Sequence, residues 1–198
     1  ADVVLHGVLG DEQLLRDVAV VQPLRHEPED LHLPVGQLGG GHGLALGPGL
    51  GRHRSTQRLV RELVFRAPIP LVVDADGVNA LAEAPEILKQ CRLAPVLTPH
   101  PGEFVRAFGG KKPVKDSERK KRAEEVARKF GVILVLKGYR TVVSEPAGKC
   151  FVNPTGNPGM ATGGSGDVLT GIIASLRGQG MRAYDAARFG VYLHGLAG

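Results

Sequence analysis

The chain has 198 residues, enough for one domain with a core of useful size. Apolar residues make up 42% and charged residues 23%, proportions typical of folded globular proteins rather than disordered ones. No apolar run reaches the roughly 18 residues that a membrane helix needs, and no basic-then-apolar leader opens the sequence. With only two cysteines, Cys91 and Cys150, we expect no disulfide framework and a cytoplasmic protein.

The net charge of +5 comes from one segment, residues 111–130, which holds nine basic and four acidic residues. We interpret this segment as a solvated helix face of mixed sign, with Glu118–Arg122 and Glu124–Arg128 as i,i+4 pairs. A polyanion site on the same segment is the alternative. Aromatic residues are only 5% and Trp is absent, so few side chains are available to stack on nucleic-acid bases. We therefore expect no nucleic-acid partner.

Short apolar runs typical of strands alternate with amphipathic stretches from residue 44 onward. The sequence predicts strands at Leu44–Leu46, Ile69–Val73, Pro95–Leu97, Val132–Leu136 and Thr141–Ser144. Apolar residues spaced on one face predict helices over Arg52–Arg66, Gly77–Gln90 and Asp116–Phe130. A hairpin is expected over residues 141–152. This alternation predicts an α/β domain with a mostly parallel sheet.

The first 43 residues show no clean period beyond Val18–Val21, and they carry four of the seven histidines. We expect a diverged or poorly ordered lead-in over residues 1–43 and a folded domain over residues 44–198.

The strongest chemical signal lies in residues 153–171, NPTGNPGMATGGSGDVLTG. From Gly166 onward the apolar residues fall on one face of a predicted helix. A glycine-rich loop that leads into a helix N-terminus presents free N–H groups and the positive end of the helix dipole, which together bind phosphate. Asp167 in the first turn is placed either to take a proton from a hydroxyl attacking phosphorus or merely to stabilise the helix start.

Four further loops follow predicted strands. Residues 47–51, GPGLG, have two interpretations: they match half of the glycine motif that binds dinucleotides, or they are an ordinary tight turn between a strand and a helix. Asp74 and Asp76 are candidates for a magnesium ion, although we favour Asp76 as the cap of the next helix. His100, between two prolines, is either a ligand contact or structural, and residues 137–141 are either a phosphate-binding basic turn or an ordinary β-turn. The sequence lacks the P-loop pattern, zinc-ligand spacing and the G-x-S-x-G elbow.

Taken together, these motifs resemble the ADP-dependent (S)-NAD(P)H-hydrate dehydratases. The matching segments, in chain order, are GPGLG, VVDADGVNAL, LTPHPGE, LKGYRT, NPTGNPGMATGGSGDVLTG and GVYLHGLAG. They extend from about Leu44 to the end of the chain, and HPGE and NPGMATGG are similar to bacterial members. The resemblance implies a ribokinase-like fold of three layers, with a mostly parallel central sheet flanked by helices. Family members continue past the position of Gly198, so we expect a fragment truncated at its C-terminus.

The resemblance also implies a reaction. Members are lyases that repair hydrated NADH and NADPH: ADP phosphorylates the ring hydroxyl of the S epimer, phosphate then leaves, and the double bond re-forms. Bacterial members use ADP and release AMP, so ADP with Mg²⁺ is the expected co-substrate, with no metal ligand assigned. The expected partners are hydrated NADH or NADPH, ADP and further copies of the chain in a homo-oligomer, with no membrane.

Site residues follow from the matching positions. The resemblance implies a catalytic centre of the base Asp167 and an anion hole at Gly164 and Gly166. It implies an adenine-nucleotide site that comprises Lys137, Gly138, Tyr139, Arg140, Thr141 and Gly166. It implies a hydrated-dinucleotide site that comprises Gly49, Gly51, His100 and Asp167. Two alternatives remain open: a kinase of the same fold acting on a vitamin-precursor alcohol, and a nucleotide-binding remnant without catalysis.

Overall fold

A computed structural model describes residues 20–21 and 43–198 of the chain. Within these residues a seven-stranded sheet has its strands in sequence order from β1 to β7. Strands β2 to β5 run parallel, while β1 at one edge and β6 and β7 at the other are antiparallel to their neighbours. The strand bounds are β1 Val20–Val21, β2 Gly43–Leu46, β3 Leu71–Val73, β4 Val96–Leu97, β5 Ile133–Leu136, β6 Val142–Ser144 and β7 Cys150–Val152.

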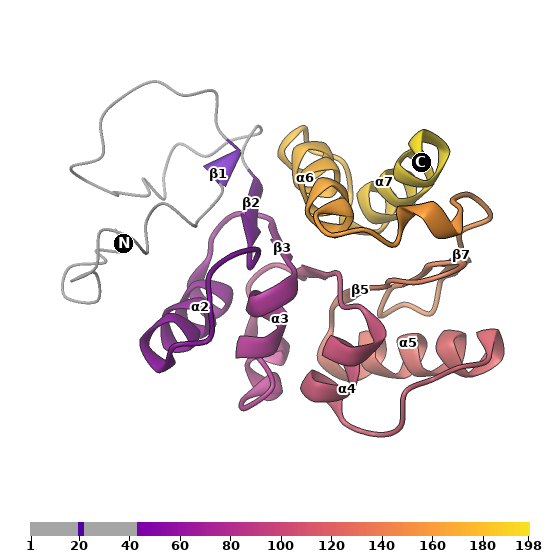
Figure 1. Cartoon of the computed structure of the whole chain (residues 1–198). Coiled ribbons are helices and arrows are strands. Elements are labelled where there is room, and N and C mark those ends of the chain that lie inside the picture. The colour runs from indigo at the N-terminus through magenta and orange to yellow at the C-terminus, as the bar shows by residue number, and fades with distance from the viewer. Residues whose placement is uncertain (1–19, 22–42) are drawn as a thin grey trace.

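Helices cover both faces of the sheet, which makes three layers (Figure 1). One face carries α2 Arg54–Arg66, α3 Ala75–Ala80, the 3₁₀ helix η1 Pro85–Gln90, α4 Pro101–Phe108 and α5 Asp116–Phe130. The other face carries α6 Ser165–Gly178 and α7 Ala183–Ala197, preceded by the short 3₁₀ helix η2 Pro158–Met160. The predicted α/β class with a parallel sheet centre and the predicted hairpin, now β6 and β7, are both confirmed.

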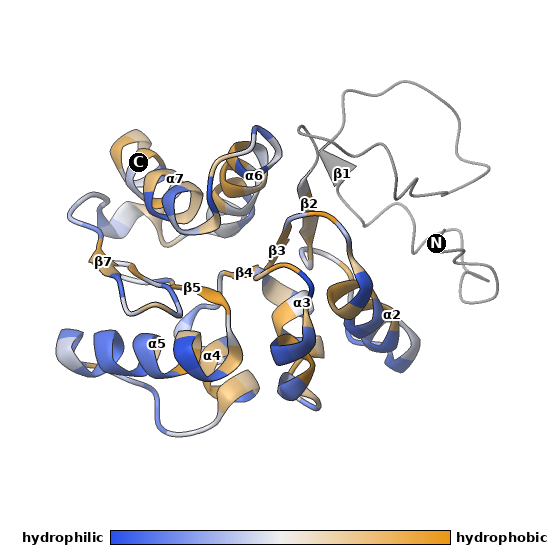
Figure 2. Cartoon of the chain, turned by 180° about the vertical axis from the view of Figure 1, so that it is seen from behind, coloured by the Kyte–Doolittle hydropathy of each residue, from blue (hydrophilic) through white to orange (hydrophobic). Residues whose placement is uncertain are grey.

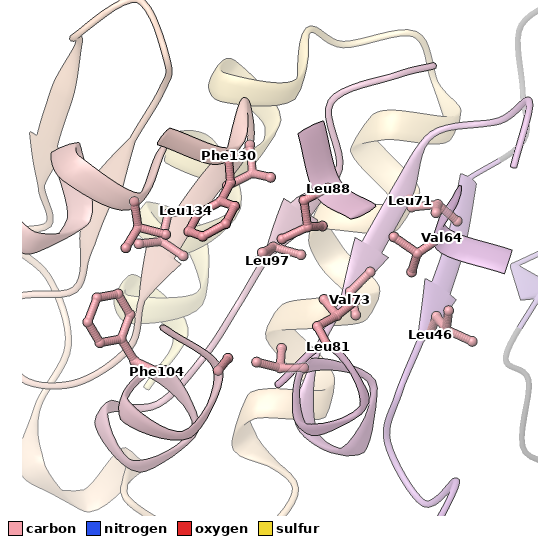
Figure 3. Packing of buried hydrophobic residues seen from close by; sticks show 14 of the residues in the cluster. Leu46, Val64, Leu71, Val73, Leu81, Leu88, Leu97, Phe104, Phe130 and Leu134 are labelled. Carbon is pink, nitrogen blue, oxygen red and sulfur yellow. The ribbon is translucent and has the colours of Figure 1, made fainter. Parts of the chain in front are cut away.

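Two apolar cores result because successive side chains of a strand point to opposite faces. On β5, Leu134 and Leu136 pack toward α4 and α5, whereas Ile133 and Val135 pack toward α6 and α7. The larger core runs from Leu46 through the middle of the sheet to the side chains of α4 and α5 (Figure 3). Strands buried on both faces explain the unbroken apolar runs in the sequence.

Helix α5 has the bounds that its periodicity predicts, and it is largely hydrophilic on its outer side (Figure 2). The two predicted ion pairs on it are wrong. Arg122 contacts Glu125 at 3.4 Å rather than Glu118, and no ion pair joins Glu124 to Arg128 within the part of the chain that the structure describes. Glu118 instead accepts hydrogen bonds from the main-chain N–H groups just before the helix, which stabilises the helix start.

The prediction of one helix over Gly77–Gln90 is also wrong. Helix α3 ends at Ala80, and η1 begins anew at Pro85. A proline lacks the N–H that a helix interior needs and forces the preceding residue out of the helical region, as the φ of −148° at Ala84 shows. Helix α4 was not predicted, although its Pro101 at the first position and the acidic residue two positions later are typical of a helix start.

The predicted lead-in, residues 1–43, lies outside the described residues except for Val20, Val21 and Gly43. Val20 and Val21 pair with Leu44 and Gly43 of β2. At Gly43 the sheet lies so close to α6 that a Cβ would be 2.6 Å from the carbonyl oxygen of Ala174. The boundary at residue 44 stays a prediction. Among the described residues, no helix is long and apolar enough to cross a membrane.

Candidate functional site

The loops that carry the sequence motifs meet at one edge of the sheet, because β2 to β5 run parallel and end on the same side. Gly47 follows β2, Asp74 follows β3, Thr98 follows β4 and Lys137 follows β5. The carboxyl ends of parallel strands are where open α/β sheets bind ligands. The N-terminus of α6 lies beside this edge, since Thr170 of α6 donates to Asp74 and a Cβ on Gly166 would be within 3.6 Å of both Asp74 and Lys137.

A buried ion pair ties two of these loops together. Lys137 Nζ lies 2.6 Å from Asp74 Oδ1, and the Asp74 side chain is only 1% exposed. The second carboxylate oxygen of Asp74 accepts a hydrogen bond of 2.8 Å from Thr170 Oγ1 on α6. Both oxygens of Asp74 are therefore engaged, and the lysine is held against the first turn of α6, where a Cβ on Gly166 would be 3.1 Å from Nζ.

The N-terminus of α6 presents main-chain donors. Gly164 is its N-cap, with a left-handed φ of 85° that favours glycine. The N–H groups of Gly163, Gly164 and Gly166 donate to no acceptor among residues 43–198. Together with the positive end of the helix dipole, such donors form an anion site. Asp167 stands in the same first turn and is exposed to solvent.

The turn Lys137–Thr141 between β5 and β6 also presents donors. Gly138 has a φ of 139° and Arg140 a φ of 55°. None of the N–H groups of residues 138–141 donates a hydrogen bond to another described residue. Main-chain donors aligned in this way recognise anions and ring acceptors.

One cavity of about 570 Å³ joins this turn to the start of α6. Its size is within the range of about 300–1,000 Å³ typical of small-molecule sites. The predicted nucleotide residues Lys137, Gly138, Tyr139, Arg140, Thr141 and Gly166 all line it, and so does His100. Further lining comes from Pro101, from the loop before α6, from α6 itself and from α7, with Asn153, Thr155, Gly156, Asn157, Pro158, Met160, Ala161, Thr162, Ser165, Leu169, Val191, His194 and Gly195.

His100 has a structural task as well as a place in the cavity wall. It is the N-cap of α4, and its Nδ1 accepts hydrogen bonds from the N–H groups of Gly102 at 2.9 Å and Glu103 at 3.3 Å. Because Nδ1 accepts, the proton of the neutral ring is on Nε2, which lies 3.2 Å from Glu103 Oε1. Both sequence interpretations of His100, as a ligand contact and as a structural residue, thus remain compatible with its position.

Three of the four predicted substrate residues, Gly49, Gly51 and Asp167, do not line this cavity, and neither does Gly164 of the predicted anion hole. Gly49 and Gly51 both have a positive φ, with open space where a Cβ would lie. The N–H of Gly51 donates to Asp76 Oδ2 at 3.0 Å. Asp76 also accepts from the Asn79 side chain, so the prediction of Asp76 as the helix cap is wrong: the N-cap of α3 is Asp74.

Sequence reasoning missed His194 on α7. Its Nε2 lies 3.3 Å from Ser165 Oγ at the start of α6, and its ring lines the cavity. Burial lowers the pKa of His194 and outweighs the opposing effect of Ser165. The imidazole is therefore biased toward its neutral form. A lone histidine in the sequence GVYLHGLAG was the available signal, but nothing in its spacing points to Ser165.

The described residues do not provide a protein cage for Mg²⁺. They contain no group of three or more His, Cys, Asp or Glu side chains that could hold a metal ion. Asp74, one of the two candidates, has both oxygens engaged by Lys137 and Thr170. The residues present thus do not fit a magnesium ion held by the protein alone.

A family model described as NAD(P)H-hydrate dehydratase matches residues 16–198. The chain belongs to this dehydratase family. The match begins inside the predicted lead-in, 28 residues before the expected domain start at residue 44. The family resemblance stated from the motifs is confirmed.

Curated relatives of the dehydratase family support the assignment. The chain is 52% identical over 155 residues to the bifunctional NAD(P)H-hydrate repair enzyme Nnr of Moorella thermoacetica, which covers 78% of this chain and 29% of that protein. It is 40% identical over 156 residues to the ADP-dependent (S)-NAD(P)H-hydrate dehydratase of Neisseria meningitidis serogroup B, covering 77% of this chain and 52% of that one. The chain thus spans about half or less of the length of these relatives.

Solved structures of a dehydratase and of a ribokinase-like protein give the same fold. An ADP/ATP-dependent NAD(P)H-hydrate dehydratase from Bacillus subtilis, co-crystallised with ATP/Mg²⁺, superposes with a TM-score of 0.66 at 37% identity, over 79% of this chain and 55% of that one. A ribokinase-like superfamily protein from Enterococcus faecalis superposes with a TM-score of 0.61 at 29% identity, over 77% and 52%. The ribokinase-like architecture predicted from the motifs is confirmed.

Proposed function

We propose that this dehydratase-family chain restores NADH or NADPH from the S epimer of the hydrated cofactor, with ADP as phosphoryl donor and AMP and phosphate as products. The observation that carries the proposal is the cavity in which the donor-rich turn Lys137–Thr141 faces the N-terminus of α6. Membership of the family and the Neisseria relative, named as ADP-dependent, support ADP as the nucleotide.

In the proposed reaction the turn Lys137–Thr141 and Gly166 bind the adenine nucleotide. The Asp167 carboxylate takes the proton of the ring hydroxyl, whose oxygen attacks the terminal phosphorus of ADP as the bond to AMP breaks. The N–H groups of Gly164 and Gly166 stabilise the charge that develops on the transferred group. The electrons of the ring nitrogen then expel phosphate from the ring carbon, and loss of a proton from the neighbouring carbon re-forms the double bond.

The hydrated dinucleotide is assigned to the other side of Asp167. His100 at the cavity rim and the open loop with Gly49 and Gly51 are the proposed contacts. The ion pair of Asp74 with Lys137 positions the lysine beneath the anion site. Since the protein offers no cage for Mg²⁺ among the residues that the structure describes, the mechanism includes no step through a protein-bound metal.

The test is product analysis with the purified chain, hydrated NADH and ADP. We expect the absorbance band of reduced nicotinamide to recover, with AMP and phosphate released in equal amounts. A stable phosphorylated product instead would identify a kinase of the same fold. Tight ADP binding with no turnover would identify a nucleotide-binding remnant. Calorimetry with ADP, ATP and AMP, with and without Mg²⁺, gives the nucleotide preference, and we expect ADP to bind most tightly and Mg²⁺ to strengthen it.

We also propose a cytoplasmic homo-oligomer. Cys91 and Cys150 are both free thiols, which suits a reducing compartment. One side of α7 leaves large apolar side chains exposed, which supports self-association, namely Phe189, Tyr192, Leu193 and Leu196. Light scattering of the purified chain tests the oligomer.

A further inference from the structure

Helix α5 is in contact with the back of the turn Lys137–Thr141, the side remote from the cavity. We propose that Arg119 is a positioning residue for nucleotide binding: its guanidinium holds the carbonyl groups of this turn so that the N–H groups face the ligand. The inference rests on the proposed nucleotide site and assigns a new residue to it. Arg119 is in the basic segment that the sequence presented as a solvated face, but only 6% of it is exposed.

The hydrogen bonds of Arg119 all go to main-chain carbonyls at the end of β5 and in the turn, and its Nη1 also lies 3.9 Å from Asp116 Oδ1. Its Nη2 donates to the oxygens of Leu136 at 3.2 Å and Lys137 at 3.3 Å, and its Nη1 donates to the oxygen of Tyr139. A guanidinium has five donors in a rigid plane, so one side chain can hold several carbonyls in a fixed relative orientation. Burial also lowers the pKa of Arg119, with Asp116 opposing.

Two further carbonyls of the turn are engaged as well. Thr141 Oγ1 donates to the oxygen of Gly138 at 3.0 Å, and the N–H of Asn153 donates to the oxygen of Thr141 at 2.9 Å. The N–H groups of residues 138–141 have no acceptor among the described residues. Four of the five carbonyls of the turn, all except that of Arg140, thus have a donor within the protein, whereas the four N–H groups of residues 138–141 are left for a ligand in the cavity.

The backbone of the turn needs such support. Arg140 has a φ of 55°, a left-handed conformation that costs free energy for a residue other than glycine. Its side chain forms an ion pair with Asp116 in the first turn of α5, at 3.1 Å. At Gly138, where φ is 139°, a Cβ would be 3.0 Å from Arg119 Nη2, so the guanidinium approaches the backbone closely.

A simple packing role for Arg119 would need none of these features. An apolar side chain could attach α5 to the hairpin by packing, but it would leave three carbonyls without their donor, which lowers stability. Only a multi-donor side chain orients three carbonyls at once. The ADP affinity, measured beside Tm, separates the two roles, because a packing role predicts a change in Tm alone.

The experiment compares Arg119→Met, Arg119→Lys and Asp116→Asn with the parent chain. The control is Val126→Ala, which removes buried apolar volume from the same helix, where Val126 is 4% exposed and packs in the core. Calorimetry gives the Kd for ADP, thermal unfolding gives Tm, and kinetics separate KM for ADP from kcat.

We expect Arg119→Met to raise the Kd and KM for ADP at least tenfold, with a smaller effect on the KM for hydrated NADH. Arg119→Lys restores part of the affinity, Asp116→Asn raises the Kd a few-fold, and Val126→Ala lowers Tm with a Kd within twofold of the parent. An Arg119→Met Kd within twofold of the parent overturns the proposal, as does an equal loss of affinity in Val126→Ala.

Two further outcomes are also decisive. If Arg119→Met does not fold, Arg119→Lys and Asp116→Asn provide the test. If both of these variants bind ADP with the affinity of the parent, the positioning role is overturned. If the parent chain itself binds no ADP, the proposed nucleotide site is wrong, and the role of Arg119 fails with it. Parental ADP binding with unaffected variants, by contrast, leaves the proposed function intact and removes only the inference about Arg119.

Discussion

Lys137 Nζ lies 2.6 Å from Asp74 Oδ1, although the two residues are 63 positions apart in the chain. Lys137 follows β5 and Asp74 follows β3, with β4 between the two strands. The pair therefore spans the central strand at the ligand edge of the sheet. It places a cation directly beside Gly166 at the start of α6.

The two halves of this pair differ in burial, and we predict unequal costs of removal. The Asp74 side chain is 1% exposed and that of Lys137 is 19% exposed. Lys137→Met leaves a fully buried carboxylate without its cation, which costs about 3–5 kcal/mol. Asp74→Asn leaves a lysine that can turn toward the cavity, and the cost is about 1–3 kcal/mol. Urea unfolding of both variants measures the difference. A larger loss for Asp74→Asn would contradict this assignment.

The second prediction concerns Gly166, where the lysine of the Asp74–Lys137 pair lies close to the backbone of α6. A Cβ there would be 3.1 Å from Lys137 Nζ and 3.6 Å from Asp74 Oδ2. Gly166→Ala therefore displaces the lysine and narrows the anion site, and we expect ADP affinity to fall about tenfold or more. Gly171→Ala is the matched control, because Gly171 lies further along α6, outside the cavity lining, and no atom lies within 4 Å of its Cβ position. Calorimetry with ADP checks both variants, and equal affinities in the two would refute the role of this contact.

The third prediction concerns pH. Burial lowers the pKa of His194 in the folded chain below its ordinary value of 6.5. Between these two pKa values the unfolded chain binds a proton that the folded chain does not, so stability is greatest well above pH 6.5 and falls as the pH drops through 6.5 toward the folded-state pKa. We expect the free energy of unfolding, measured with urea, to decrease less between pH 7.5 and pH 5.5 in His194→Gln than in the parent. Equal decreases in the two proteins would contradict this role of His194.

Local sequence patterns predict the ends of helices well where a single residue, such as a glycine or a proline, ends or starts the helix. The bounds of α5 follow from its apolar spacing and from Gly131, whose left-handed φ of 70° ends the helix. Pro85 also predicts the break between α3 and η1. The break was missed because the prediction used only the spacing of apolar residues, which continues past Pro85.

Contacts between residues far apart in the chain were harder to predict from the sequence. The sequence places Asp74 and Lys137 directly after predicted strands, but their pairing depends on which strands are neighbours. Arg119 is one of nine basic residues in its segment, and only the position of the β5–β6 turn distinguishes it from its solvated neighbours. His194 reaches Ser165 through the packing of α7 against α6, which no local period encodes.

The fourth prediction addresses Asp167 in the first turn of α6. Asp167→Asn keeps the size of the side chain and removes the proton acceptor. Loss of a general base typically costs about 10²–10⁴-fold in rate, and a base that also orients the attacking hydroxyl belongs at the upper end of that range. The main-chain donors of Gly164 and Gly166 are unchanged, so the affinity for ADP should stay within a few-fold of the parent.

The alternative role for Asp167 gives a very different result. If the carboxylate only stabilised the helix start, the substitution would cost about 1 kcal/mol or less in stability and hardly change turnover. The measurement is the rate at which the reduced-nicotinamide band recovers at saturating ADP, for the parent and the variant, with Tm recorded for both. Asp185→Asn, in the first turn of α7, is the control for the loss of one helix-start carboxylate. A rate for Asp167→Asn above about a tenth of the parental rate would exclude Asp167 as the base, because general-base loss costs at least about a hundredfold.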